Sequence, residues 1–204
     1  MRKGARVAKR ARSAASDDDD SENEDESCVW QDGTSVYFFA DVDLKQTRAC
    51  MQALRKANVE AVKANVKHVS LYIHSGGGDV LAGFTLFDFI RTNALPVHTY
   101  ACGYVASAAT FLLIAGQTRY AHENSILLIH QMKTGFWGKF EDLKDEMKNS
   151  KQLMARIRTM YLRHCKMGKE NLRTILRQEL EMNAQRALEY GVVDVVIPTL
   201  RTAR

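Results

Sequence analysis

Three polar segments, each placed directly after an apolar run, carry the residue types of nucleophilic catalysis. Ser107 lies in the small-residue run GYVASAA, His130 follows the apolar run SILLI, and three successive glycines, Gly76 to Gly78, follow the run VSLYI. A serine hydroxyl becomes a nucleophile when a neighbouring base accepts its proton, and backbone N–H groups can stabilise the oxyanion that then forms. The chain therefore holds a hydroxyl, an imidazole and a flexible backbone suited to acyl transfer.

Each of these segments also has a plainer interpretation. Small residues around a serine allow tight packing, glycines suit a turn that needs positive φ, and a single histidine is more often structural than catalytic. The glycine run lacks the spacing of a dinucleotide or phosphate loop, so neither ligand is indicated. Cys102 lies close to Ser107 in the sequence and is a rival nucleophile or, more plainly, a small buried apolar residue.

The apolar patterns predict strands that alternate with helices. Strands are expected at 36–40, 69–73, 95–102, 125–129 and 192–197, and helices at 44–64, 80–91, 110–115, 139–164, 169–177 and 184–190. This alternation is typical of an α/β fold with parallel pairing. Ligands of such sheets bind outside the carboxyl ends of the strands. We therefore expect the glycines, the serine and the histidine to meet in one crevice.

Residues 1–27 differ from the rest of the chain in composition. Six basic residues precede eight acidic ones, which gives this segment a net charge of −2 in a chain of net charge +5 and leaves +7 for residues 28–204. With Met1 and Val7 as its only large apolar side chains, the segment cannot bury enough surface to offset its ordering entropy. We expect a disordered tail at 1–27 and one folded domain at 28–204.

The sequence also limits the compartment and the partners. Its basic start fits an organelle-targeting or nuclear-localisation segment, but the adjacent acidic block argues against binding to nucleic acid. No secretory core and no apolar run of about 20 residues is present, which predicts a protein without a membrane span. The four cysteines form no C-x-x-C pair, as is typical of reduced thiols in the cytoplasm.

Four segments in the same order resemble the proteolytic subunits of the Clp proteases (ClpP). They are YIHSGGG at 72–78, GYVASAA at 103–109, LIHQ at 128–131 and AQRALEYGVVD at 184–194. Each is moderately specific alone, and the four together are strongly specific over about residues 36–197. The resemblance implies a crotonase-like α/β fold of repeated β-β-α units with a protruding handle helix, for which residues 139–164 are the candidate.

The resemblance also implies a serine–histidine–acid triad. Ser107 matches the nucleophile and His130 the general base, while Gly78 and Ala108 match the residues whose backbone N–H groups form the oxyanion hole. The acid falls on Glu179, where the family has an aspartate, and Glu181 is the alternative. A glutamate can orient an imidazole in such a triad.

Several positions depart from the family pattern. Gly76 stands where the family loop commonly has proline, Ala108 where methionine is usual, and Met132 where proline follows the histidine-glutamine pair. These departures leave open a catalytically impaired structural subunit. A crotonase-type acyl-CoA enzyme is a more distant alternative, because that chemistry does not require a serine nucleophile.

The assembly is also implied by the resemblance. The family forms heptameric rings stacked in pairs, and a hexameric ATP-driven unfoldase feeds unfolded polypeptides into the chamber that the rings enclose. The expected function is that of the proteolytic subunit of an ATP-dependent Clp protease, a serine endopeptidase. The ATP is used by the partner, so no cofactor and no metal is expected in this chain.

Overall fold

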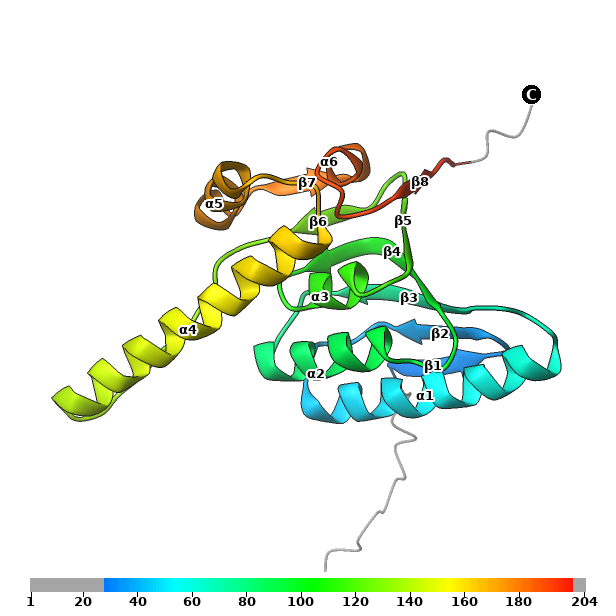
Figure 1. Cartoon of the computed structure of the whole chain (residues 1–204), viewed down its shortest axis with the longest axis horizontal. Coiled ribbons are helices and arrows are strands. Elements are labelled where there is room, and N and C mark those ends of the chain that lie inside the picture. Colours follow the sequence, from blue (N-terminus) through cyan, green and yellow to red (C-terminus); the bar gives the residue numbers. More distant parts are fainter. Residues whose placement is uncertain (1–27, 200–204) are drawn as a thin grey trace, which may run out of the picture.

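A computed structural model describes residues 28–199, so the tail predicted at 1–27 lies outside the described residues. The described part forms one sheet with helices packed against it (Figure 1). Its strands are β1 (Val29–Asp32), β2 (Ser35–Phe38), β3 (Val69–Ser75), β4 (Val97–Ala106), β5 (Thr118–His122), β6 (Ile126–Leu128), β7 (Glu181–Asn183) and β8 (Val195–Ile197). Its helices are α1 (Leu44–Lys63), α2 (Val80–Arg91), α3 (Ala109–Ile114), α4 (Phe140–His164), α5 (Lys169–Gln178) and α6 (Ala184–Glu189).

The strand order places the predicted chemical segments side by side. The sheet runs β1-β2-β3-β4-β5-β8, and β6 pairs with β4 and with β7. The long strand β4 has two neighbours on the same side, because its first half pairs with β5 and its last three residues pair with β6. The β3–β4 and β4–β6 pairs are parallel. The carboxyl ends of β3, β4 and β6 therefore lie at the same edge of the sheet.

Most predicted elements are present, and the differences are local. The six expected helices and five expected strands are found, but β1, β5 and β7 were not predicted. These strands are three to five residues long, too short to show a clear alternation of apolar residues. Parallel pairing is confirmed for the centre of the sheet and is wrong for the antiparallel pairs β1–β2 and β6–β7. The predicted end of a strand at residue 102 is also wrong, because pairing with β3 and β6 carries β4 on to Ala106.

Aspartate caps begin the two helices that flank the glycine segment. Asp43 Oδ1 accepts a hydrogen bond of 2.6 Å from the N–H of Gln46 at the start of α1. Asp79 Oδ1 does the same for the N–H of Ala82 in α2, also at 2.6 Å. Each cap satisfies a backbone donor that has no partner within its own helix. Because Asp79 directly follows Gly78, this cap also fixes the end of the glycine segment.

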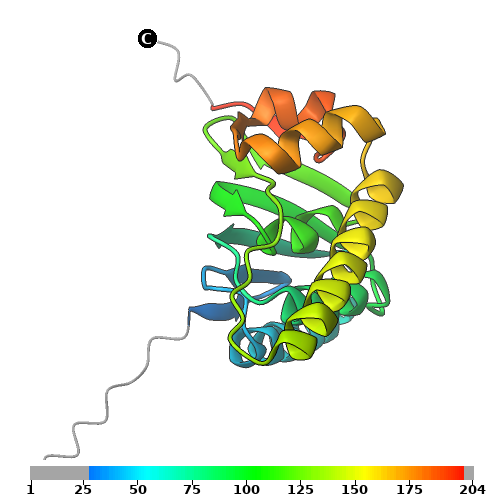
Figure 2. The ribbon, with the colours of Figure 1, turned by 90° about the vertical axis from the view of Figure 1, so that its left-hand side faces the viewer.

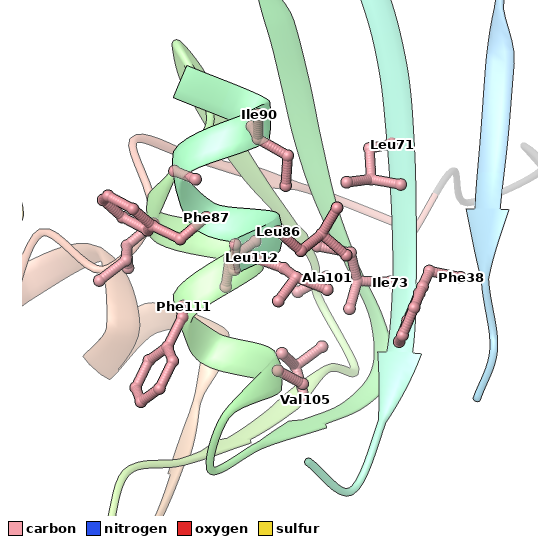
Figure 3. Close-up of a cluster of buried hydrophobic side chains, with 14 of the residues drawn as sticks. Phe38, Leu71, Ile73, Leu86, Phe87, Ile90, Ala101, Val105, Phe111 and Leu112 are labelled. Atoms are coloured by element: carbon pink, nitrogen blue, oxygen red, sulfur yellow. The ribbon is translucent and has the colours of Figure 1, made fainter. Parts of the chain in front are cut away.

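The core lies between one face of the sheet and helices α1, α2 and α3. Figure 3 shows Leu71 and Ile73 of β3 pointing toward Leu86 of α2 and Leu112 of α3, and all four side chains are fully buried. Figure 2 shows the molecule from the side, with the strands stacked one above another and helix α4 along one side of the stack. A well-packed apolar layer of this kind makes the carboxyl edge of the sheet a rigid support for a site.

The other face of the sheet carries a column of aromatic rings. Consecutive ring centroids lie 4.8, 5.0, 4.5 and 4.6 Å apart and the rings are nearly parallel. The column crosses five strands, with one ring from each, in the order Trp30, Tyr37, Tyr72, Tyr100 and Tyr120. Side chains alternate between the two faces of a strand, so these rings alternate with core residues and support the register of the sheet.

Helix α4 extends away from the sheet at its N-terminal end (Figure 1). Of its side chains, only those of Ile157 and Tyr161, near the C-terminal end, are buried. The apolar residues near the N-terminal end, Phe140, Leu143 and Met147, are exposed. The apolar side chains of this helix therefore pack on the body of the protein only in its C-terminal half.

Candidate active site

Ser107 occupies a strained turn between β4 and α3. Its φ is +54°, in the left-handed region that residues other than glycine rarely adopt. Its N–H donates to the carbonyl O of Leu128 at 2.8 Å, and its own carbonyl O accepts from the N–H of Thr110 at 3.0 Å and from Thr110 Oγ1 at 2.7 Å. The N–H and the carbonyl O of Ser107 are therefore both hydrogen-bonded, and these bonds stabilise the turn. Strain that is held in this way is common at functional sites.

The glycine segment lies directly against this turn. A Cβ built on Gly77 would stand 2.6 Å from Ser107 Cβ, 2.7 Å from the carbonyl O of Ala106 and 3.0 Å from the N of Ala108. Gly77 and Gly78 have φ values of +100° and +144°. Both the spacing and the backbone conformation therefore require glycine at Gly77.

Val42 fixes the glycine segment from its other side. The N–H of Val42 donates to the carbonyl O of Gly77, and the carbonyl O of Val42 accepts from the N–H of Asp79, both at 2.7 Å. Within the described residues, the N–H groups of Gly78 and Ala108 donate to no other group. The arrangement thus leaves two backbone donors free beside the serine, as an oxyanion site requires.

His130 follows β6 and is mostly buried, with 13% of its side chain exposed. Its Nδ1 lies 2.6 Å from the carbonyl O of Gln131. A carbonyl oxygen only accepts, so Nδ1 carries the proton and donates it in this bond. In the neutral imidazole, the other ring nitrogen, Nε2, then carries no proton, which is the form that a general base needs.

Glu179 lies at the C-cap of α5 in a left-handed conformation, with φ +50° and ψ +39°. Its Oε1 is 4.0 Å from His130 Nδ1, and its Oε2 forms an ion pair of 3.2 Å with Lys133 Nζ. The carboxylate therefore lies beside the imidazole but is shared with a lysine. Glu179 is exposed, and it ends helix α5 next to the histidine.

The rival acid, Glu181, has a different neighbour. Burial raises the pKa of Tyr104 above its usual value, and the charge of the Glu181 carboxylate raises it further. The Glu181 carboxylate therefore lies beside Tyr104. No ion pair joins Glu181 to His130 in the part of the chain that the structure describes. The geometry favours Glu179 as the acid next to the imidazole.

The expected segments meet, but the expected hydrogen bonds do not all form. The turn of Ser107 is bonded to Leu128, two residues before His130, so the two segments adjoin. Among residues 28–199, however, Ser107 Oγ makes no hydrogen bond with His130. Catalytic hydrogen bonds are often long or poorly aligned in proteins without bound substrate.

Cys102 is poorly suited to nucleophilic chemistry. Burial raises the pKa of its thiol to about 11, so the thiolate is scarce near neutral pH. This supports the interpretation of Cys102 as a small apolar residue rather than as a rival to Ser107.

No sequence pattern indicates three further contributors to the site. They are the carbonyl of Gln131, the ammonium group of Lys133 and the backbone of Val42. Each acts through backbone placement or through a contact formed only on folding. An isolated lysine three residues after a histidine has no pattern that could have identified it.

The comparison with protein families gives an independent result. The family model described as Clp protease matches residues 31–199, which is most of the chain. The chain belongs to the Clp protease family. Members of this family are serine peptidases, and the mixed α/β architecture described above is consistent with the Clp protease fold. Ser107, His130 and the two free N–H groups thus belong to a chain of the Clp protease family.

Two further observations concern ligands and membranes. Among the described residues, no group of three or more His, Cys, Asp or Glu side chains is arranged to hold a metal ion. None of the helices in residues 28–199 is both long and apolar enough to cross a bilayer.

Proposed function

We propose that this protein is a serine endopeptidase of the Clp type that cleaves unfolded polypeptides. The proposal rests on one observation above the others: the glycine segment lies against Ser107, and the N–H groups of Gly78 and Ala108 have no partner among residues 28–199. An acyl-transfer site needs a nucleophile and an oxyanion site within one peptide group of each other. The family assignment favours this activity over the acyl-CoA chemistry of related folds.

In the proposed reaction Ser107 Oγ attacks the carbonyl carbon of a peptide bond, and its proton passes to His130 Nε2. The tetrahedral oxyanion accepts hydrogen bonds from the N–H groups of Gly78 and Ala108. The C–N bond then breaks as the imidazolium returns the proton to the leaving amine, which leaves an acyl ester on Ser107. Water, deprotonated by His130, hydrolyses this ester and regenerates the serine.

Glu179 has the role of an orienting acid in this proposal. Its carboxylate stabilises the imidazolium that forms during each proton transfer. The carbonyl of Gln131 already fixes the tautomer of His130, because it accepts from Nδ1. The contribution of Glu179 is therefore mainly electrostatic, and it is weakened by the ion pair with Lys133.

The assembly proposal follows from family membership and from the shape of α4. We propose a crotonase-like subunit whose α4 acts as the handle, heptameric rings stacked in pairs through these handles, and a hexameric ATP-driven unfoldase as the partner. The exposed Phe140, Leu143 and Met147 support this proposal, because another copy of the chain would bury them. Residues 28–204 would form the peptidase domain, with 1–27 as an added tail.

One observation favours a second candidate, a subunit that assembles without cutting. The Oε1 of Glu179 lies 4.0 Å from His130 Nδ1, beyond hydrogen-bond distance, and that nitrogen is bonded to Gln131 instead. In this candidate the chain shapes the ring while another chain cleaves.

A covalent probe separates the two candidates. The assembled wild-type protein is treated with a fluorophosphonate and digested, and the labelled residue is identified by mass spectrometry. The peptidase proposal expects label on Ser107, and none on Ser107→Ala, although that variant still assembles. Ser35→Ala, at the start of β2 and therefore at the opposite edge of the sheet, serves as the matched control. Assembled protein that takes no label, or a Ser107→Ala variant that still cleaves peptides, contradicts the proposal.

A further inference from the structure

A hollow of about 310 Å³ begins at the glycine segment. Gly78 and Asp79 form one end of it, the segment after His130 contributes Met132 and Lys133, and α4 contributes Glu146 and Leu153. Because Gly78 is one of the two proposed oxyanion donors, a peptide whose carbonyl is held there would place an adjacent side chain near this end of the hollow.

The hollow is lined by more negative than positive side chains. Glu146 is partly buried and makes no ion pair or hydrogen bond with any other residue that the structure describes. Asp79 is a second carboxylate, and one of its oxygens caps α2. Lys133 is the only cation among the lining residues, and its ammonium group is paired with Glu179. The lining is therefore net negative, and one carboxylate is free to bind a cation.

The walls of the hollow suit a long side chain with an aliphatic stem. Leu81, Met132 and Leu153 present apolar surface, while the free carboxylate of Glu146 lies on the α4 side. Lysine and arginine side chains bury their methylene groups along apolar surface and keep their charged ends near polar partners. Both features of the hollow match this type of side chain better than an acidic or a short one.

We infer that this hollow receives the side chain of the residue whose carbonyl is attacked, and that Glu146 selects lysine or arginine at that position. The inference rests on the proposed peptidase function and adds a substrate class to it. Glu146 acts by charge: its carboxylate attracts a cationic side chain and repels an anionic one. It is thus a specificity-determining residue and takes no part in bond breaking.

The test uses the assembled full-length chain and four fluorogenic peptides that differ only at the residue before the scissile bond, which is Arg, Lys, Leu or Glu. The measured quantity is kcat/KM for each peptide. We expect the wild type to cleave the Arg and Lys peptides about 10-fold faster than the Glu peptide, a typical discrimination for one pocket contact. Glu146→Gln lowers kcat/KM for Arg and Lys about 10-fold and changes the Leu peptide less than about twofold. Glu146→Lys reverses the order of the Arg and Glu peptides.

The matched control is Glu141→Gln, on the same helix. Glu141 is exposed, pairs with Lys144 and does not line the hollow, so its substitution leaves the order of the four peptides unchanged. An equal response of all four peptides to Glu146→Gln, or a wild type that prefers Leu and is indifferent to charge, overturns the inference.

Labelling of Ser107 by the fluorophosphonate separates this failure from failure of the function itself. The probe carries no peptide side chain, so it reports on the nucleophile independently of the hollow. Label on Ser107 without a preference for Arg and Lys overturns the specificity alone. Absence of label overturns the peptidase proposal and the specificity together.

Discussion

The backbone of Gly77 and the side chain of Ser107 are in direct contact, although they come from different strand ends. A methyl group on Gly77 would lie 2.6 Å from Ser107 Cβ, a separation that real Cβ atoms essentially never show. The nearest backbone atom, the carbonyl O of Ala106, would lie 2.7 Å away. The contact therefore fixes the distance between the proposed nucleophile and the loop that carries one of its oxyanion donors.

Gly77→Ala is expected to abolish peptidase activity and to lower the free energy of unfolding by about 2 kcal/mol or more, because the new methyl group meets backbone and the residue keeps a positive φ. The loss of one oxyanion donor alone is expected to cost about 10²–10³ in kcat. Peptide cleavage and urea denaturation measure the two effects.

Gly76→Ala is the matched control for this substitution. A Cβ at Gly76 meets no atom of the described residues within 4 Å, and the φ of Gly76 is not in the positive range. This variant is expected to stay within about 0.5 kcal/mol of the wild type, as for most unrestricted surface changes. A Gly77→Ala protein as active and as stable as Gly76→Ala would show that the loop and the serine turn are not in contact in solution.

Glu179→Gln is expected to lower kcat by about 10–10²-fold, less than the roughly 10⁴-fold seen when an imidazole is left in the wrong tautomer. The effect is smaller because the carbonyl of Gln131 already accepts from His130 Nδ1. Glu179→Asp restores part of the rate. Steady-state cleavage of a peptide substrate gives kcat and KM separately.

Glu181→Gln tests the assignment of the acid. Its carboxylate lies beside Tyr104, so this substitution is expected to leave kcat within about threefold of the wild type, since exposed charges interact weakly with distant groups. If Glu181→Gln were the more damaging of the two substitutions, the assignment of Glu179 would be wrong.

Asp194→Asn is expected to lower the free energy of unfolding at pH 7 by about 1–3 kcal/mol, the range for hydrogen bonds to charged groups. Asp194 Oδ1 lies 2.5 Å from Arg119 Nη2, and Oδ2 accepts from Arg119 Nε at 2.9 Å and from the N–H of Arg119 at 3.0 Å. The substitution leaves the guanidinium without its anion, although it keeps the carbonyls of His164 and Gly191 as acceptors.

The same pair predicts a pH dependence. Burial alone would raise the pKa of Asp194, but the hydrogen bonds and charge of Arg119 outweigh it and hold this pKa below its usual value. Its stabilisation is thus complete above the pKa of an unfolded aspartate, about 3.9, and is lost as the pH falls through the lower pKa of the folded state. The stability difference between wild type and Asp194→Asn therefore shrinks on acidification. A difference that stays constant from pH 7 to pH 2 would contradict this account. Glu189→Gln, in an exposed pair with Arg186, serves as the control with little effect at any pH.

Leu143→Asp in α4 is expected to reduce assembly, because an apolar side chain that a second copy would cover is replaced by a charge. Mass photometry at fixed protein concentration measures the change in particle mass. Leu143 has 43% of its surface exposed and does not belong to the buried core of the described residues, so we expect the fold of the single chain to be retained. Val62→Asp, on α1 and 69% exposed, is the control that leaves the mass distribution unchanged. An assembly unaffected by Leu143→Asp would argue against α4 as the contact between copies.

Elements with a periodic apolar pattern could be predicted from the sequence, whereas short strands without such a pattern could not. Helices α1 and α2 were recognised from the apolar patterns of their segments, and the aspartate caps that the structure shows at their starts agree with those patterns. The short strand β7 was missed because its three residues are held by pairing with β6 rather than by a pattern of their own.

The same contrast between predictable and unpredictable features applies to the candidate site. Ser107 and His130 stand after recognisable apolar runs, so parallel pairing brings their segments together as expected. The sharing of Glu179 between His130 and Lys133 depends on the left-handed end of α5, which no residue in the local sequence specifies. The positions of whole segments were predictable, whereas the final few ångströms between side chains depend on tertiary packing.

Thr110 joins the nucleophile turn to α4, since its hydroxyl contacts both the carbonyl O of Ser107 and the hydroxyl of the buried Tyr161. A helix of 25 residues is about 37 Å long, so its exposed N-terminal part and its buried C-terminal part belong to one long element. A contact that another molecule makes on the exposed part therefore has a hydrogen-bonded connection to the serine turn, through Tyr161 and Thr110.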